Sequence, residues 1–200
     1  MNYSLTLLTV LWLFFGFSHS LLADLKVKNS FYRLFGFNYT SYRVFYNIVA
    51  FVFLTTILYL QVVTTSPLLY QPTTFTMLLS LSLCLFGATI MLLCVIKYFK
   101  QLSGMFKEST VPKLETGGLH RFVRHPLYFG TIVFVVGLLL YFPYVKNAVA
   151  AAIVIVYTII GAVFEEKKLV QTFGNDYKEY QQAVPMIFPW RKSKTRTSGS

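Results

Sequence analysis

The chain has 200 residues, of which 56% are hydrophobic and only 12% are charged, whereas soluble globular domains carry about 25% charged residues. Its mean hydropathy is +0.59, and long uncharged runs separate the charged segments. This composition excludes a soluble globular protein and indicates an integral membrane protein.

Five segments are apolar and long enough to be membrane-spanning helices, since a bilayer core about 30 Å thick takes roughly 20 helical residues to cross. The predicted spans are about 3–23, 42–63, 74–96, 127–142 and 147–164, and the last two are short. Pro143 marks the turn between those two. We therefore predict an all-α, polytopic helical bundle that forms a single integral membrane domain over residues 1–190.

The first predicted span has an alternative interpretation, because a secretory signal peptide also begins with an apolar segment. This segment lacks the basic residues that open a signal peptide, and four more predicted spans follow it. We therefore expect it to remain in the protein as a membrane span.

The basic residues predict the orientation in the membrane. All but Lys146 of the 18 Lys and Arg residues lie in the first loop, the third loop or the segment after the fifth span. By the positive-inside rule these parts are cytoplasmic and the N-terminus lies outside. This topology and anionic lipid headgroups account for the net charge of +11, so we expect membrane lipid and no nucleic acid as a partner. Residues 191–200 are predicted to be a disordered basic tail.

The two cysteines do not indicate a disulfide or a metal site. Cys84 and Cys94 belong to the third predicted span, where ten residues of helix separate them by about 15 Å. No metal-ligand spacing lies near them, and we predict no metal.

His19 lies within the first apolar segment. Polar side chains at membrane depth are costly and usually face the interior of the bundle. Two interpretations stay open: a hydrogen bond that joins neighbouring helices, and a functional role.

The third loop ends in GGLHRFVRHPLYFG, which sets two arginines and two histidines beside an apolar run. Pro126 suits the first position of a helix, where its missing N–H does no harm. The N–H groups of Leu127 and Tyr128, flanked by Arg124 and His125, would then form an anion-binding helix N-terminus. In the alternative interpretation, the arginines only anchor the loop at lipid phosphates.

Glu165 and Glu166 follow directly after the fifth predicted span. Because neighbouring helical residues point about 100° apart, one glutamate can face the bundle while the other faces water or lysines. Beyond them an apolar stripe at helical spacing predicts an amphipathic cytoplasmic helix, which Gly174 interrupts. The stripe consists of Leu169, Phe173, Tyr177 and Tyr180. A pocket between these two segments would suit a zwitterionic, partly aromatic ligand.

In these two segments the chain resembles the isoprenylcysteine carboxyl methyltransferase-like superfamily of integral membrane methyltransferases. Its members carry Gly-[Leu/Ile]-Tyr-x-x-x-Arg-His-Pro-x-Tyr and then Glu-Glu-x-x-Leu-x-x-x-Phe-Gly-x-x-Tyr-x-x-Tyr, and the match covers residues 115–190. His120 stands where the superfamily usually has Tyr. The short pieces SHSLLA and VPMIFPW are most similar to the methanethiol S-methyltransferase and NnrU-like branch.

The resemblance implies S-adenosyl-L-methionine as cofactor, with S-adenosyl-L-homocysteine as product, bound by the half of the chain from about 98 to 190. It implies that Glu165 or Glu166 binds the amino group or the ribose hydroxyls, and that the arginines engage the carboxylate. The implied cofactor-binding residues are His120, His125, Pro126, Leu127, Tyr128, Glu165, Glu166 and Tyr177.

The resemblance also implies methyl transfer, most readily to a small or hydrophobic thiol. A thiol reacts as its thiolate, whose formation nearby cations favour, so we expect His19, Arg121 and Arg124 to be catalytic. One alternative is carboxyl methylation of an isoprenylcysteine-like or other lipidic acceptor. A second alternative is a non-enzymatic, NnrU-like membrane protein of nitrogen-oxide metabolism or transport.

Overall fold

The structure, a computed structural model, describes residues 3–36, 38–103 and 114–190. The tail over residues 191–200, predicted to be disordered, lies outside the described residues. Within the described ranges the chain forms helices and no β-strand. These are α1 (Tyr3–Ala23), α2 (Leu25–Phe35), α3 (Tyr39–Val63), α4 (Thr74–Ser103), the 3-10 helix η1 (Gly118–Arg121), α5 (Pro126–Tyr141), α6 (Val145–Phe173) and α7 (Asn175–Ala183).

The long helices have the character of membrane spans. By length and composition α1, α3, α4 and α6 can each cross a membrane. α5 is also apolar but has only 16 residues, in agreement with the short fourth span expected from the sequence. The prediction of an all-helical membrane bundle is confirmed, and of the five predicted spans four are long enough to cross a membrane while α5 is shorter.

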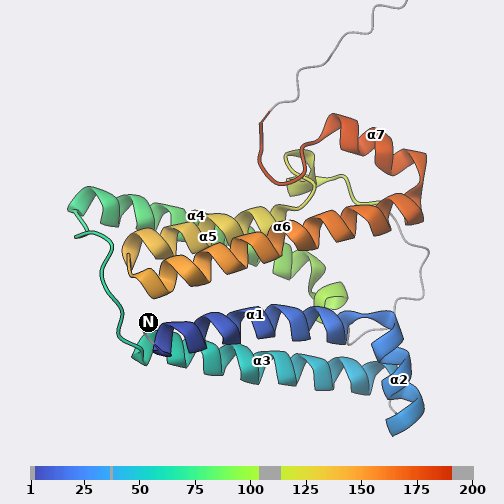
Figure 1. Ribbon diagram of the computed structural model, residues 1–200. Helices are drawn as coiled ribbons and strands as arrows, with labels where there is room; N and C mark the ends of the chain where they lie inside the picture. The colour runs from blue at the N-terminus through green and yellow to red at the C-terminus, as the bar shows by residue number, and fades with distance from the viewer. Residues whose placement is uncertain (1–2, 37, 104–113, 191–200) are drawn as a thin grey trace, which may run out of the picture.

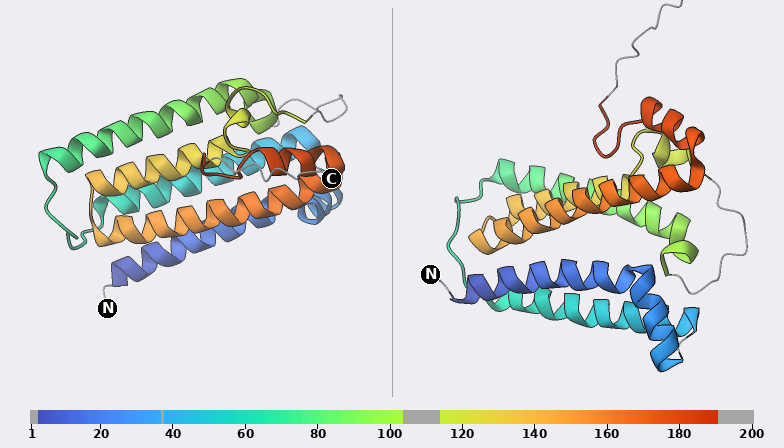
Figure 2. Two further views of the ribbon diagram at one scale, coloured as in Figure 1. Left: turned by 90° about the horizontal axis from the view of Figure 1, so that it is seen from above. Right: turned by 45° about the vertical axis from the view of Figure 1, so that its right-hand side comes forward.

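The helices form two layers (Figure 1). α1 and α3 lie side by side in one layer, and α4, α5 and α6 form the other. α5 packs against both α4 and α6, an arrangement that Figure 2 shows from two further directions. α7 and the segment that follows it lie beside the end of α6, at the end of the bundle opposite the N-terminus. The candidate site is at this end.

α4 and α5 pack closely because small residues lie in their contact. A Cβ atom at Gly87 would lie 2.7 Å from the carbonyl oxygen of Gly130, and one at Gly137 would lie 2.7 Å from Cys84 Sγ. Glycine lets the two backbones approach to a distance that any side chain would prevent. This contact sets the position of α5 and of the motif at its N-terminus.

Polar contacts join the helices at the other end of the bundle. Lys146, near the start of α6, donates from Nζ to the carbonyl oxygens of Val62 and Thr64 at the end of α3, where the helix dipole favours a cation. Gln61 Nε2 donates to Asn147 Oδ1 at 2.9 Å. The one basic residue outside the predicted cytoplasmic loops therefore joins α6 to α3.

α2 is an element that the sequence analysis did not predict. It begins directly after Asp24 and carries Lys28 and Arg33 together with the exposed Leu34 and Phe35. Its apolar and basic residues alternate at helical spacing over only 11 residues, which is too few for a membrane span.

α6 is longer than the predicted fifth span, which ended at residue 164. It continues to Phe173, so Glu165 and Glu166 lie inside the helix instead of after it. A helix of 29 residues is about 43 Å long, longer than a bilayer core about 30 Å thick. Gly174, with a φ of +58°, then separates α6 from α7, at the interruption that the sequence predicted.

Candidate functional site

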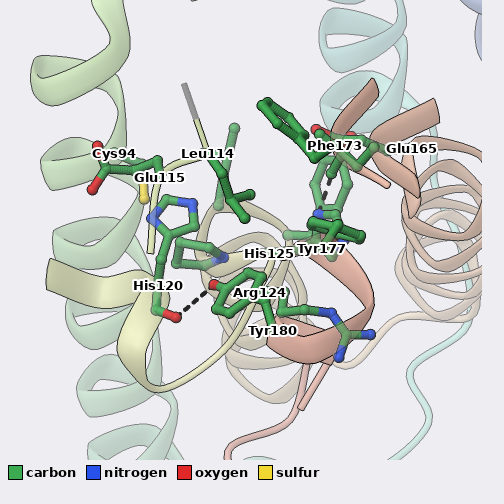
Figure 3. Close-up of a pocket in the computed structure, with 14 residues that line it drawn as sticks. Cys94, Leu114, Glu115, His120, Arg124, His125, Glu165, Phe173, Tyr177 and Tyr180 are labelled. Atoms are coloured by element: carbon green, nitrogen blue, oxygen red, sulfur yellow. Dashed lines mark hydrogen bonds and ion pairs between the residues drawn. The ribbon is translucent and has the colours of Figure 1, made fainter. Parts of the chain in front are cut away.

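A cavity of about 410 Å³ lies where α4, α5, α6 and α7 meet (Figure 3). Both segments singled out in the sequence contribute to its walls, although about 40 residues of chain separate them. Of the predicted site residues, it is lined by His120, Arg124, His125, Pro126, Leu127, Tyr128, Glu165 and Tyr177.

The N-terminus of α5 has the local structure that the sequence predicted. Pro126 occupies the first turn of the helix, and Leu127 and Tyr128 follow it on the cavity wall. The backbone N–H groups of Arg124 and His125 donate to the carbonyl oxygens of Pro185 and Met186, at 2.9 and 3.0 Å. The segment after α7 is thereby fastened to the start of α5.

Arg124 forms a buried ion pair with Glu166. Its Nε donates to Oε1 at 2.9 Å and its Nη2 to Oε2 at 2.8 Å, and the two side chains are only 7% and 10% exposed. Its Nη1 donates to the carbonyl oxygens of Gln181 and Val184. These bonds direct the guanidinium toward α6 and the end of α7, so Arg124 joins three elements beneath the cavity.

Glu166 receives further hydrogen bonds on the same two oxygens. His125 Nε2 and the Tyr177 hydroxyl both lie 2.7 Å from Oε1, and Gln181 Nε2 donates to Oε2. Burial, and then the bond to this carboxylate, raise the pKa of Tyr177 well above its ordinary value, so its hydroxyl stays protonated and donates. Glu166 is the centre of a buried network and does not line the cavity.

Glu165, its neighbour on α6, has the opposite environment. Its side chain is 46% exposed and lines the cavity. His125 Nδ1 lies 3.6 Å from its Oε2. As helical spacing allowed, the two adjacent glutamates point in different directions. Glu166 faces the bundle, and Glu165 presents a carboxylate to the cavity.

His125 lies between these two carboxylates. Its Nε2 faces Glu166 and its Nδ1 faces Glu165. Its ring stacks on Tyr128 with centroids 5.4 Å apart and planes 15° apart. Both ring nitrogens and one ring face are therefore engaged, which fixes the orientation of the imidazole.

The opposite wall comes from α4 and from the segment that leads into η1. Figure 3 shows Cys94, Glu115 and His120 on one side of the cavity and Glu165 with Tyr177 on the other. Lys97 Nζ lies 3.1 Å from Glu115 Oε1, and this bond, followed by one from the Gly117 N–H, lowers the pKa of Glu115. Burial, followed by the charge of Lys97, lowers the pKa of His120.

Two residues predicted to be catalytic lie away from the cavity. Arg121 is exposed on η1 and is not among the lining residues. His19 lies between α1 and α3, where its Nε2 is 2.7 Å from the hydroxyl of Tyr46. This contact corresponds to the interhelical hydrogen bond that the sequence analysis left open for His19.

The cavity also contains residues that the sequence analysis did not name as site residues. Leu169, Phe173 and Tyr180 belong to the predicted amphipathic stripe, so helical spacing could have placed them there. Cys94, Leu114 and Glu115 carry no such signal, because they reach the cavity only through the packing of α4 and the segment before η1. Within residues 3–36, 38–103 and 114–190, no cluster of three or more His, Cys, Asp or Glu is placed to hold a metal ion.

Residues 75–176 match the phospholipid methyltransferase family. The match covers half of the chain and runs from α4 into α7. The chain belongs to the phospholipid methyltransferase family. The resemblance inferred from the two sequence segments is confirmed.

Relatives of this family member carry methyltransferase names. A protein named methanethiol S-methyltransferase 1 from Bradyrhizobium diazoefficiens is 38% identical over 94 residues, which cover 44% of this chain and 30% of the relative. A methanethiol S-methyltransferase from Crocosphaera subtropica is 35% identical over 89 residues, 44% of this chain and 34% of the relative. Protein-S-isoprenylcysteine O-methyltransferase B from Arabidopsis thaliana is 35% identical over 79 residues, 39% of this chain and 40% of the relative.

The chain therefore spans less than half the length of each of these relatives. No solved structure matches it.

Proposed function

We propose that this protein is an integral membrane methyltransferase that takes its methyl group from S-adenosyl-L-methionine and transfers it to a small or hydrophobic thiol. One observation carries the proposal: the two motif segments converge on a single cavity, with a carboxylate on one wall and a helix N-terminus beside it. The family and the names of the relatives support the reaction class.

The residues of the cavity fit this methyl donor. Its volume of about 410 Å³ lies within the roughly 300–1,000 Å³ of small-molecule sites. The donor is a zwitterion with an additional positive sulfonium and an aromatic base. Glu165 is suited to its amino group, the N–H groups at the start of α5 to its carboxylate, and the rings of Phe173 and Tyr177 to the cationic and aromatic parts.

Bound there, the donor would supply an electrophilic methyl group whose transfer removes the positive charge of the sulfonium. The residues of the chain then have to align the acceptor with that methyl group and exclude water. Such positioning contributes up to roughly 7–11 kcal/mol to catalysis.

We propose that Arg124 and Glu166 position other residues and do not touch the donor. The N–H groups of Arg124 point to Glu166 and to two backbone carbonyl oxygens. We therefore do not assign Arg124 to the carboxylate of the methyl donor, the contact that the resemblance implied. Together they hold His125 and the segment after α7 against α5. His19 and Arg121 lie off the cavity, and we propose no contact between them and the reacting atoms.

The membrane location supports an apolar acceptor that arrives through the lipid. Carboxyl methylation of an isoprenylcysteine-like acceptor is the second candidate, because a relative with that name is 35% identical over 79 residues. We further propose one integral membrane domain over residues 1–190, with the donor bound by the half from about 98 to 190 and the third loop and C-terminus in the cytoplasm.

The test uses protein purified in detergent. We expect the unmodified chain to bind labelled S-adenosyl-L-methionine, and we expect Glu165→Gln to lose this binding because the carboxylate on the cavity wall is neutralised. Glu179→Gln is the matched control, since Glu179 is exposed on α7 and is not a lining residue. Absence of binding by the unmodified protein would contradict the proposal.

The acceptor is then identified with a panel of substrates. The protein and the methyl donor are incubated with methanethiol, longer alkyl thiols and prenylcysteines, and the methylated product is detected by mass. A methyl thioether is the expected product. A methyl ester without any thioether would replace the thiol proposal with the carboxyl one.

A further inference from the structure

The two walls of the cavity differ in chemistry. The wall of α5, α6 and α7 carries the carboxylate of Glu165 and the rings of Phe173 and Tyr177, which we assigned above to the methyl donor. The facing wall carries Cys94, Glu115 and His120 (Figure 3). None of these three residues was assigned to the methyl donor in "Proposed function". If the donor binds the first wall, the acceptor has to approach from the second.

A thiol acceptor has to lose its proton before it reacts, because the thiolate is the nucleophile. The chain has three histidines, and imidazole is the most common general base in enzymes. His19 lies off the cavity, beside Tyr46. His125 has a carboxylate at each ring nitrogen. His120 is the histidine on the facing wall.

We propose that His120 is the general base that removes the proton of the acceptor thiol, and that the wall formed by Cys94, Leu114 and Glu115 is the acceptor side of the cavity. This inference rests on the proposed thiol methyltransferase function. The sequence predicted that His120 binds the methyl donor, whereas here it contacts the acceptor. The predicted catalytic residues were His19, Arg121 and Arg124, so the base is a different residue.

The backbone around His120 holds the imidazole on the wall. The hydroxyl of Tyr180 donates to the carbonyl oxygen of His120 at 2.6 Å, and the His120 N–H donates to the Gly117 carbonyl oxygen at 3.2 Å. Gly118, with a φ of +60°, makes the turn that begins η1. The side chain is therefore carried by a segment fastened to α7 and not by a loose loop.

The charged and titratable groups around His120 favour the neutral imidazole. Burial and the cation Lys97 lower its pKa, with His125 acting in the same direction, while Glu115 opposes them. The other ionisable residues that line the cavity are Cys94, Arg124, Tyr128, Glu165, Tyr177 and Tyr180. A neutral imidazole has one nitrogen that accepts a proton.

Glu115 is less suited to be the base. Its carboxylate accepts from Lys97 Nζ and from the Gly117 N–H, both at 3.1 Å, and these bonds lower its pKa. A carboxylate stabilised in this way has less affinity for a proton. Lys97 can instead stabilise the thiolate that His120 generates, because a cation near a thiol favours its ionised form.

His120 accepts the proton from the S–H bond of the acceptor, and that electron pair stays on sulfur. The thiolate then forms a bond to the methyl carbon, while the bond from this carbon to the donor's sulfonium breaks and leaves a neutral thioether. The imidazolium releases its proton to water, so each turnover yields one methylated thioether and one proton.

The first experiment compares His120→Gln with the unmodified protein. We expect the affinity for labelled S-adenosyl-L-methionine to be retained, while kcat/KM with an alkyl thiol falls by about 100-fold or more, the range of general base catalysis. An aromatic thiol that is already ionised at neutral pH should lose much less, and added imidazole should restore part of the rate of His120→Ala. Loss of donor binding in His120→Gln, or an unchanged rate with the alkyl thiol, would overturn the base role.

A second experiment needs no activity. The protein is labelled at the histidine ring carbons, which yields three resonances, and the one absent from His120→Gln, or from His120→Asn if the first variant does not fold, is assigned to His120. Its titration midpoint should lie below the ordinary value of 6.5 and shift when an alkyl thiol is added. A midpoint that does not change when the alkyl thiol is added would overturn the proposal.

The outcomes also separate this inference from the proposed function. Methyl transfer to a prenylcysteine carboxylate but to no thiol would overturn the role of His120 and leave the methyltransferase assignment standing, since a carboxylate needs no base. Failure of the unmodified protein to bind the donor would overturn both.

Discussion

Adjacent residues of this protein have different tasks because neighbouring helical side chains point about 100° apart. Glu166 turns into the bundle and accepts bonds from Arg124, His125, Tyr177 and Gln181. Glu165 turns to the cavity, with nearly half of its side chain exposed. A pair that looks redundant in the sequence therefore combines a structural carboxylate with one available to a ligand.

The first prediction compares the free energies of unfolding of variants at Glu166 and Glu165. Glu166→Gln leaves the buried guanidinium of Arg124 without its counter-charge, and breaking a buried ion pair in this way costs about 3–5 kcal/mol. Glu165→Gln changes a half-exposed group, so its effect should stay within about 0.5 kcal/mol. Unfolding in detergent micelles measures both, and equal losses would contradict the assignment of Glu166 as the buried centre.

The second prediction concerns the hydroxyl of Tyr177. Tyr177→Phe removes a buried donor to Glu166, and a hydrogen bond to a charged group is worth about 1.5–3 kcal/mol. The matched control is Tyr59→Phe, since Tyr59 is 65% exposed on α3. The same unfolding measurement applies, and a Tyr177→Phe variant as stable as the control would show that the bond contributes nothing.

The third prediction is a pH dependence that His120 causes. Burial lowers its pKa in the folded protein, so the unfolded chain binds the proton more readily. The free energy of unfolding should therefore decrease as the pH falls below about 6.5. The thermal unfolding midpoint of the unmodified protein should drop more steeply between about pH 7.5 and pH 5.5 than that of His120→Gln. Identical slopes would show that His120 does not cause the pH dependence.

At the scale of the elements, the contact between α4 and α5 determines where the motif lies. α5 is short, and its first turn forms part of the cavity wall. α4 supplies Cys94 to the facing wall and Lys97 to the ion pair with Glu115. A change in the separation of these two helices would therefore alter the width of the cavity.

The fourth prediction tests this packing. In Gly87→Ala the new Cβ would lie 2.7 Å from the Gly130 carbonyl oxygen and from the Phe134 nitrogen, so the helices must move apart at a cost of about 1–3 kcal/mol. Gly161→Ala is the control, because its nearest atom, the Tyr128 hydroxyl, is 4.0 Å away. We expect loss of thermal stability and of donor binding only in the first variant. Equal behaviour of the two variants would contradict the prediction.

At the scale of the whole molecule, the two ends of the bundle differ in charge. One end carries the loop over residues 64–73, which has no charged residue, and the turn from α5 to α6. The other carries the cavity, α7 and the start of α2. From the positive-inside rule we expect the cavity on the cytoplasmic side, where the proposed methyl donor would be available.

The fifth prediction tests this orientation. In intact cells, Gln71→Cys in the 64–73 loop should react with a membrane-impermeant thiol reagent, and Asn175→Cys at the start of α7 should react only after the membrane is opened. The unmodified protein is the control, because Cys84 and Cys94 lie within the membrane-spanning part of α4. Labelling of Asn175→Cys from outside would reverse the topology.

The class of the protein and the local structure of its motifs could be read from the sequence because they depend on neighbouring residues. Apolar length defines the spans, Pro126 begins α5, and Gly174 ends α6. The stripe that includes Phe173 and Tyr177 faces the cavity as its helical spacing indicated.

The tertiary structure alone decided what these residues contact. Arg124 meets Glu166 across 42 positions of the chain and Val184 across 60, so no local pattern reveals that its guanidinium is engaged internally. Likewise, the rotation of α6 about its axis determines that Glu165 faces the cavity. The packing of α4 determines that Cys94 and Glu115 lie on the wall opposite Glu165. These facts depend on how helices distant in sequence are rotated and packed, and that is where sequence periodicity carries no information.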